Sequence, residues 1–244
     1  MPNSGVHVLA ILQARMSSRR LPGKVLRPIL GRPMLSLQIE RLRRCRRIDR
    51  LIVATSSDPS DAPIAELCSR ERIDCFRGDL QDVLDRFYQA ASRYAPEHVV
   101  RLTGDCPLAD PGLIDRVIDF HLEGGYDFTG NALVRTFPRG LDVSVFRHAL
   151  LREAWREAQR PAEREHVTLY MKAHPERYRL GDFRDAQDRS HLRWTVDEPA
   201  DFDFVRAVYE RLYPANPSFG SADVYRLLER EPGLAAMNRV AGEA

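Results

Sequence analysis

The sequence predicts an α/β fold in three layers, in which a mixed, mostly parallel β-sheet is covered by helices on both faces. Short apolar runs alternate with longer segments of helical period through the first half of the chain, which is the pattern of a parallel sheet with crossover helices. The 244 residues contain no internal repeat and no long linker. We therefore expect residues 1–244 to form a single domain.

Four apolar runs in the first half predict buried strands, at residues 8–12, 51–55, 74–76 and 98–102. The segments between them carry apolar residues at helical spacing. One helix is expected after Pro33, a second after the capping sequence Asp61-Ala62-Pro63, and a third from Val83. A fourth opens at Asp110-Pro111 and ends at Gly124-Gly125.

The pattern changes after Gly125. A turn-rich stretch at 126–129 is followed by the alternating residues 143–146, which predicts a β-hairpin insertion around residues 126–150. Further elements are expected as helices at 150–159, 163–173 and 199–212 and as a strand at 192–196.

The composition excludes several classes of protein. Basic and acidic residues are balanced, 37 against 35, so no global field favours binding to nucleic acid or to an anionic membrane. The four cysteines form no C-x-x-C pair and no zinc-ligand pattern. Neither a secretory signal nor an apolar run of about 18 residues is present in the sequence, so we expect a cytoplasmic protein.

The most informative segment is the basic loop at residues 13–24, which follows the first predicted strand. Basic loops are often only solvated surface. Here, however, a buried strand leads into the loop and a Pro-Gly turn precedes Lys24, which favours a phosphate site. Arg15 and Arg20 can form bidentate contacts to phosphate oxygens, Lys24 supplies a point charge, and Ser18 can donate a hydrogen bond. The neighbouring Arg19 is expected to face solvent.

Two standard nucleotide-binding motifs are excluded. No G-x-G-x-x-G sequence follows a strand, and Gly23-Lys24 lacks both the preceding glycine and the following hydroxyl residue of a P-loop. A dinucleotide-binding fold and a P-loop ATPase are therefore not supported.

Two carboxylates follow predicted strands, at the edge where α/β sheets bind ligands. Asp105 comes after Gly104 at the end of one strand, and Asp197 follows another. An aspartate in such a place often caps the next helix, but Asp110 already offers that cap, and Glu198 or Asp201 can serve the helix that begins at residue 199. Asp105 and Asp197 are therefore free to hold Mg²⁺, which prefers carboxylate and phosphate oxygens.

Taken together, these segments resemble the cytidylyltransferases, the family that includes CMP-Kdo and CMP-sialic acid synthetases. The closest resemblance is to the type found in spore-coat polysaccharide biosynthesis. It rests on five motifs that occur in order along most of the chain, at residues 13–24, 101–107, 138–146, 164–168 and 193–201.

The resemblance implies a fold like that of the nucleotide-diphospho-sugar transferases, which is Rossmann-like, and it implies roles for individual residues. Lys24, Arg15 and Asp105 would be catalytic, and Asp105 and Asp197 would bind Mg²⁺. The implied nucleotide-binding residues are Gln13, Ala14, Arg15, Ser18, Arg20, Lys24, Thr55, Ser56, Gly78, Arg101, Thr103 and Gly104. The implied acceptor-binding residues are Arg139, Asp142, Arg164, Glu165 and His166.

The implied reaction is transfer of CMP from CTP to a small acidic acceptor, with release of pyrophosphate. The acceptor would be a nonulosonic acid, a Kdo-like sugar or a phosphonate, used in surface polysaccharide or glycoconjugate biosynthesis. The family also implies a homodimer, with the hairpin region around residues 126–150 taking part in dimer formation. A histidine within a helix is more often structural than catalytic, and this applies to His166.

Three alternatives stay open at this point. A sugar-1-phosphate nucleotidyltransferase would use UTP or GTP, but it usually carries a glycine-rich loop, whereas this loop is poor in glycine before Pro22. A glycosyltransferase of related fold would hold its metal with a D-x-D motif, and the match at 201–203 does not follow a strand. A non-catalytic nucleotide-binding protein would not need Lys24 and both aspartates.

Overall fold

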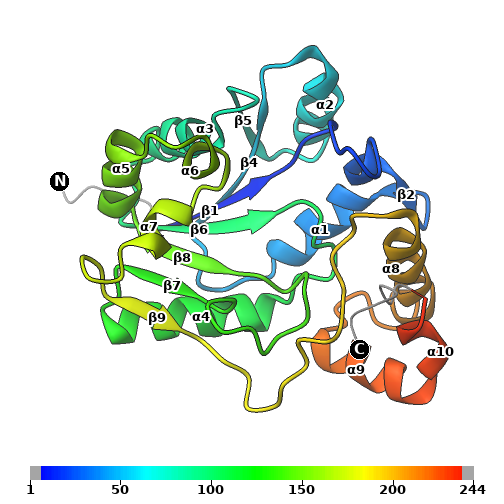
Figure 1. Ribbon diagram of the computed structural model, residues 1–244. Helices are drawn as coiled ribbons and strands as arrows, with labels where there is room; N and C mark the ends of the chain where they lie inside the picture. Colours follow the sequence, from blue (N-terminus) through cyan, green and yellow to red (C-terminus); the bar gives the residue numbers. More distant parts are fainter. Residues whose placement is uncertain (1–6, 238–244) are drawn as a thin grey trace.

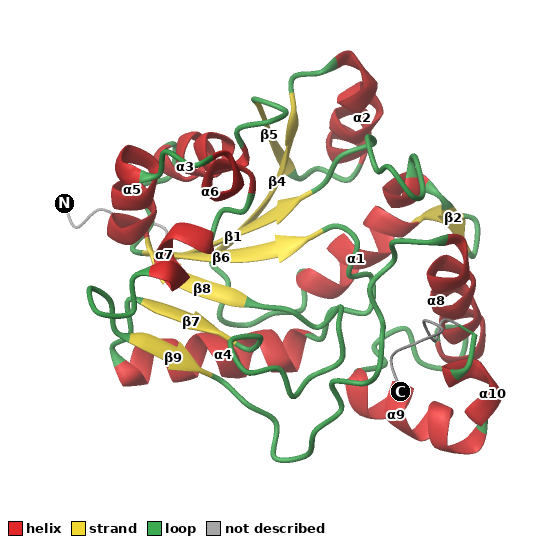
Figure 2. Ribbon diagram, in the orientation of Figure 1, coloured by secondary structure: helices red, strands yellow, loops and turns green. Residues whose placement is uncertain are grey.

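The computed structural model describes residues 7–237, and a seven-stranded sheet forms its centre (Figures 1 and 2). The strands are β1 (Val8–Gln13), β4 (Arg50–Ser56), β5 (Asp74–Gly78), β6 (His98–Thr103), β7 (Phe128–Gly130), β8 (Ser144–Arg147) and β9 (Leu180–Asp182). They are arranged in the order β5-β4-β1-β6-β8-β7-β9. Neighbours pair in parallel except at β8, which is antiparallel to both β6 and β7. The mixed, mostly parallel sheet is confirmed.

Helices cover both faces of this sheet. They are α1 (Met34–Leu42), α2 (Ala62–Arg70), α3 (Val83–Ser92), α4 (Pro111–Gly124), α5 (His148–Glu157), α6 (Pro161–Glu165), α7 (Leu169–Ala173), α8 (Pro199–Leu212), α9 (Ser221–Arg230) and α10 (Pro232–Ala235). The apolar residues of α1, α2, α4, α8 and α9 form one core with one face of the sheet, and those of α3, α5 and α7 form a second core with the other face. Two short strands, β2 (Pro28–Ile29) and β3 (Arg32–Pro33), form a separate ribbon before α1.

Strand β1 shows why the first half folds as the sequence predicts. Val8, Ala10 and Leu12 belong to one core, and Leu9 and Ile11 belong to the other. All five are at most 2% exposed. Because full burial of one large aliphatic side chain contributes about 1.5–3 kcal/mol, a continuous apolar run is stable only as a central strand with both faces covered.

The ends of α4 also follow the predicted signals. Asp110 caps the helix, since its Oδ1 accepts a hydrogen bond from the Leu113 backbone N–H at 2.9 Å. Gly125 ends the helix in the left-handed conformation, with φ of 60°, which glycine adopts without strain.

The predicted hairpin around 126–150 lies at another place in the fold than expected. Strands β7 and β8 pair antiparallel, as a hairpin would, with Phe128 opposite Phe146. They nevertheless extend the central sheet, because β8 also pairs with β6. Both phenylalanines are buried in the same core as α5, so the pair is part of the sheet rather than an insertion beside it.

Two elements of the second half differ from the predicted secondary structure. The expected strand at 192–196 forms only one isolated bridge, between Arg193 and Arg139. Apolar and polar residues alternate in this segment because Trp194 and Val196 are buried in the core. Its backbone forms hydrogen bonds with loops instead of with a neighbouring strand. The expected helix at 163–173 is broken after Glu165 into α6 and α7.

Candidate active site

A cleft of about 710 Å³ opens where β1 and β6 end, the edge at which parallel sheets bind ligands. The loop after β1 forms one wall, and the end of β6, the segment before α3 and the end of α6 form the others. The sequence-predicted residues that line it are Gln13, Ala14, Arg15, Ser18, Arg20, Lys24, Arg101, Thr103, Gly104, Asp105, Glu165, His166 and Asp197.

The basic loop is held in place by the buried carboxylate of Asp61. Its Oδ1 accepts the Met16 backbone N–H at 2.6 Å, and its Oδ2 accepts the backbone N–H and the hydroxyl of Ser56 at 3.1 and 2.5 Å. The sequence predicts a helix cap here, and Asp61 does occupy the N-cap position of α2, but its side chain makes no capping bond. It ties the loop to the end of β4 instead.

The loop closes on itself at Gly23. The Gly23 backbone N–H donates to the Met16 carbonyl at 3.0 Å, and Gly23 has φ of 67°, in the region that favours glycine. A 3-10 turn, Lys24–Leu26, begins at the next residue. This turn directs the Lys24 side chain inward, where it is only 9% exposed.

Lys24 connects the two predicted metal-binding aspartates. Its Nζ lies 3.2 Å from Asp105 Oδ2 and 3.0 Å from Asp197 Oδ1, and it donates to the Val196 carbonyl at 2.6 Å. The Asp105 and Asp197 side chains are 32% and 23% exposed, so both carboxylates face the cleft from partly buried positions. Two segments far apart in the sequence thus meet at one ammonium group.

Asp105 is placed by the close approach of β6 to β1. The Gly104 N–H donates to the Gln13 carbonyl at 2.8 Å. A Cβ at Gly104 would lie 3.1 Å from both the Gln13 carbonyl oxygen and the Ala14 Cβ, which explains the glycine. The Asp105 carbonyl in turn accepts the Val196 N–H at 2.8 Å, which brings Asp197 alongside.

Asp197 is surrounded by cations. Arg20 and Arg193 lie 2.9 and 3.0 Å from its Oδ2, in addition to Lys24 on Oδ1. Burial raises the pKa of Asp197, but the hydrogen bond from Lys24 and the three positive charges outweigh it, so the pKa of this carboxyl lies below its usual value. Asp197 is therefore ionised at neutral pH. Its backbone N–H donates to Asp201 at 2.9 Å, which fixes the turn into α8.

These residues fit a bound divalent cation of the hard type. Asp105 and Asp197 offer oxygen ligands from two rigid segments and reach a common point, where Lys24 lies. Arg15, Arg20 and Ser18 of the basic loop line the cleft beside them, and such side chains can bind phosphate oxygens.

Three predicted nucleotide-binding residues do not line the cleft. Thr55 and Ser56 are fully buried at the end of β4, and the Ser56 hydroxyl is used by Asp61. Gly78 ends β5, and a Cβ there would come within 3.0 Å of the Arg86 side chain. Ser56 thus helps to hold Asp61, which anchors the loop, and Gly78 leaves room for Arg86.

The five predicted acceptor-binding residues divide in a similar way. Glu165 and His166 line the cleft where α6 ends. Arg164 instead donates to Asp82 and to the Trp155 carbonyl, which joins α6 to α3 and α5. The remaining two lie in the 131–143 connection: Asp142 forms a bidentate pair with Arg135 at 2.6 and 3.1 Å, and Arg139 is exposed.

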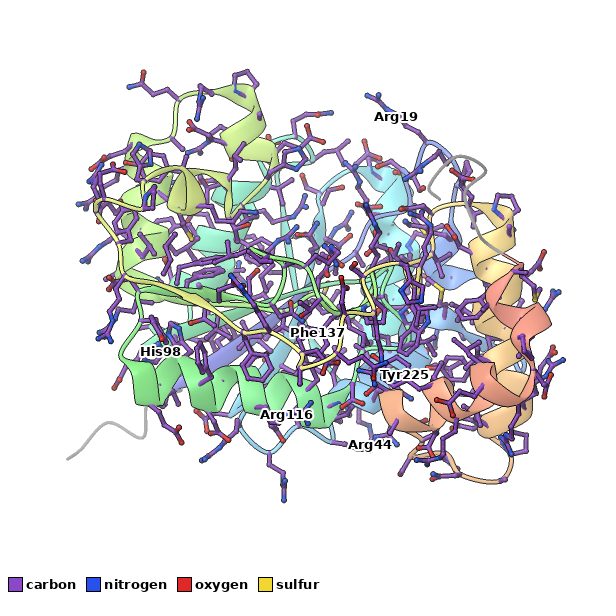
Figure 3. All side chains as sticks on the ribbon, turned by 60° about the horizontal axis from the view of Figure 1, so that its bottom comes forward. Arg19, Arg44, His98, Arg116, Phe137 and Tyr225 are labelled. Atoms are coloured by element: carbon purple, nitrogen blue, oxygen red, sulfur yellow. The ribbon has the colours of Figure 1, made fainter. Side chains whose placement is uncertain are left out.

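Sequence reasoning missed several residues of the cleft, of which Arg86 is the most informative. Arg86 is 1% exposed, lines the cleft from α3, and donates from Nη1 to the Asp79 carbonyl at 2.6 Å. Burial and the charge of Arg15 lower its pKa. A signal was available, because Arg86 occupies the same helix face as Val83 and Ala90. Arg19, expected to face solvent, is exposed and extends away from the chain (Figure 3), and it belongs to the lining of the cleft.

Comparison with known proteins identifies the family. A model of the cytidylyltransferase family matches residues 9–212. The chain belongs to this family. It is therefore a nucleotidyltransferase, as its motifs imply.

Individual relatives agree with this assignment. The chain is 35% identical to the spore coat polysaccharide biosynthesis protein SpsF of Bacillus subtilis (strain 168), over 93% of this chain and 96% of the relative. A cytidylyltransferase structure from Leptospira borgpetersenii superimposes with a TM-score of 0.91 at 29% identity, covering 97% of this chain and 99% of the other. A CMP-Kdo synthetase complexed with CTP has a TM-score of 0.65 at 18% identity, over 84% and 99% of the two chains, and supports the fold.

Proposed function

We propose that this cytidylyltransferase transfers CMP from CTP to a small acidic acceptor, releases pyrophosphate and depends on Mg²⁺. The observation that carries the proposal is the contact of Lys24 with both Asp105 and Asp197 beside a cationic loop. Carboxylates and cations arranged side by side match the two parts of a metal-triphosphate complex. Mg²⁺ would be held by the two aspartates and would offset negative charge on the phosphates.

The residues of the loop would act by position and charge. Arg15, Arg20 and Ser18 bind the triphosphate, and Lys24 stabilises the charge that develops as pyrophosphate leaves. An oxygen of the acceptor forms a bond to the α-phosphorus while the bond between that phosphorus and the pyrophosphate oxygen breaks. The proton of the acceptor hydroxyl passes to solvent or to a neighbouring base, and no covalent intermediate on the enzyme is needed.

The acceptor would enter beside the end of α6, where Glu165 and His166 line the cleft together with Arg101. Arg101 Nε already donates to the Gln13 side chain at 3.1 Å, so its guanidinium is oriented. A guanidinium at this place suits a carboxylate or phosphonate acceptor. The similarity to a spore coat polysaccharide biosynthesis protein and to a CMP-Kdo synthetase supports a Kdo-like or nonulosonic acid as the acceptor, in surface polysaccharide biosynthesis. We further propose that the protein acts in the cytoplasm and as a homodimer.

A pyrophosphate-release assay tests the proposal. The protein is incubated with each of CTP, UTP, GTP and ATP, with Mg²⁺, and with a panel of nonulosonic acids, Kdo, phosphonates and sugar 1-phosphates. We expect release with CTP and an acidic acceptor only, and a loss of at least about 10²-fold in Asp105→Asn. The matched control is Asp203→Asn, whose carboxylate pairs with Arg206 on the surface of α8. Activity with UTP or GTP and a sugar 1-phosphate would support the alternative nucleotidyltransferase.

A further inference from the structure

A group of side chains with the chemistry to hold a metal ion lies at the opposite end of the sheet from the cleft. His7, Glu97 and His98 each offer one ligand atom, and these atoms lie within 4.8 Å of one another. His7 precedes β1 and His98 begins β6, whereas the cleft opens where both strands end. Six residues of strand separate the two ends, which corresponds to about 20 Å.

The backbone at this place is fixed from two sides. The His7 carbonyl accepts the N–H groups of Glu97 and His98 at 3.1 and 2.9 Å. The N–H groups of His7 and Val8 donate to one carboxylate oxygen of Asp49 at 3.0 and 2.8 Å. The three side chains therefore share a framework of hydrogen bonds that joins β1, β6 and the turn before β4, rather than meeting by chance at a mobile surface.

A chain of buried groups orients His98. Its Nδ1 lies 3.0 Å from Nε2 of His121, and Nδ1 of His121 lies 2.9 Å from the hydroxyl of Thr129. His98 is 8% exposed, and His121 and Thr129 are fully buried. A metal-binding histidine characteristically donates its other ring N–H to a fixed acceptor. Here Nδ1–H of His98 would donate to His121, which leaves Nε2 as the ligand atom (His98 is labelled in Figure 3).

The charges at the group agree with a divalent cation. Glu97 supplies a carboxylate, and His7 Nδ1 lies 3.0 Å from its Oε2 with both side chains exposed to solvent. Besides His7, Arg147 acts on His98, but its Nε is held 3.3 Å from Asp127 Oδ1 and 3.3 Å from the Tyr126 carbonyl. Its charge is thus offset by a carboxylate of its own.

From this arrangement we propose that His7, Glu97 and His98 form a Zn²⁺ site, separate from the catalytic cleft. Two imidazoles and one carboxylate are a ligand set that Zn²⁺ accepts, with water in the fourth position. The ion would fasten the start of β1 to the start of β6, the two central strands that carry the cleft at their other ends. Its role would be structural, and catalysis would not require it.

Titration of the full-length protein with Zn²⁺ by calorimetry tests the site. The protein carries no affinity tag, and excess Mg²⁺ is present to occupy the catalytic aspartates. We expect one Zn²⁺ per chain, and a loss of affinity of at least about tenfold in His7→Ala and in Glu97→Gln, since even a group that only orients a ligand changes metal affinity by 10–100-fold. Both replaced side chains are exposed, so the fold is retained.

Two further variants distinguish Zn²⁺ binding at this site from Zn²⁺ binding elsewhere on the chain. His191→Ala removes an exposed histidine far from the site in sequence, and Asp105→Asn alters the cleft; both should bind Zn²⁺ as the wild type does. CMP transfer by His7→Ala should equal that of the wild type. The proposal is overturned if His7→Ala binds Zn²⁺ with unchanged affinity, if Asp105→Asn abolishes the binding, or if the wild type binds no Zn²⁺ at millimolar concentration.

Discussion

Replacement of Lys24 by methionine removes one positive charge from the centre of the candidate site and keeps a side chain of similar length. In the wild type, Nζ contacts Asp105, Asp197 and the Val196 carbonyl within 3.2 Å. Without it, the two carboxylates remain close together. Asp197 keeps Arg20 and Arg193 as partners, whereas Asp105 loses the ion pair that it makes with Lys24.

The cost to stability follows from burial. Breaking a fully buried ion pair costs about 3–5 kcal/mol, and an exposed pair contributes at most about 1 kcal/mol. The Lys24 side chain is 9% exposed but its partners are 32% and 23% exposed, so solvent screens part of the interaction. We expect Lys24→Met to lose about 2 kcal/mol, which corresponds to about 4–8 °C in Tm for a chain of this size.

Thermal unfolding with and without Mg²⁺, together with the pyrophosphate assay, measures both consequences. Mg²⁺ alone should stabilise Lys24→Met more than the wild type, because the cation takes the place of the missing ammonium between the carboxylates. CMP transfer should fall by about 10²- to 10³-fold, since Lys24 no longer offsets charge on the leaving group.

Lys172→Met is the matched control for stability, because Lys172 is the other lysine of the chain and is exposed on α7. Its Tm should change little. A Lys24→Met protein with the Tm of the wild type would refute the stability reasoning. A variant that retained more than a tenth of the activity would remove Lys24 from the catalytic group.

Three other substitutions test how the site is held. Asp61→Asn should destabilise the protein by about 2 kcal/mol and raise KM for CTP, since one of its oxygens becomes a donor facing the Met16 or Ser56 donors; an unchanged KM would mean that the loop needs no anchor. Gly140→Ala should lower Tm by several degrees, because φ is 106° and a Cβ would lie 2.4 Å from the Thr195 nitrogen; a wild-type melting curve would contradict this. Arg86→Lys should raise KM for CTP more than it lowers kcat, because one buried ammonium cannot replace a guanidinium fork, and equal KM values would exclude contact with the nucleotide.

The sequence predicts the four parallel strands and the basic loop because their signals are local. Residues 8–12 are apolar without interruption, and the residues proposed to bind phosphate follow within one short segment. The general rule that the ends of parallel strands meet at one edge of a sheet is then sufficient to predict where the loop lies in the folded chain. Asp105 lies at the predicted edge for the same reason.

Other features depend on contacts between distant segments. The local sequence does not show whether the Asp61 carboxylate caps α2 or accepts a hydrogen bond from Met16, because either role requires a carboxylate at this position. Likewise, apolar and polar residues alternate at 192–196 because Trp194 and Val196 are buried. Such an alternation does not show whether a partner strand is present. An arginine at a core position of its helix is the local signal for Arg86, but the sequence does not show that this position faces the cleft.

The contacts among Lys24, Asp105 and Asp197 imply that the two halves of the proposed ligand assist each other. A phosphate that approaches Lys24 must compete with the two carboxylates, and a divalent cation that approaches the carboxylates must compete with Lys24. When both ligands bind, the phosphate pairs with Lys24 and the cation pairs with the two carboxylates. Each ligand therefore binds groups that have lost their contact with each other. Binding of the anion and binding of the cation are then coupled reciprocally, so each raises the affinity for the other. In the proposed function, the site would thereby favour the metal-triphosphate complex over either component alone.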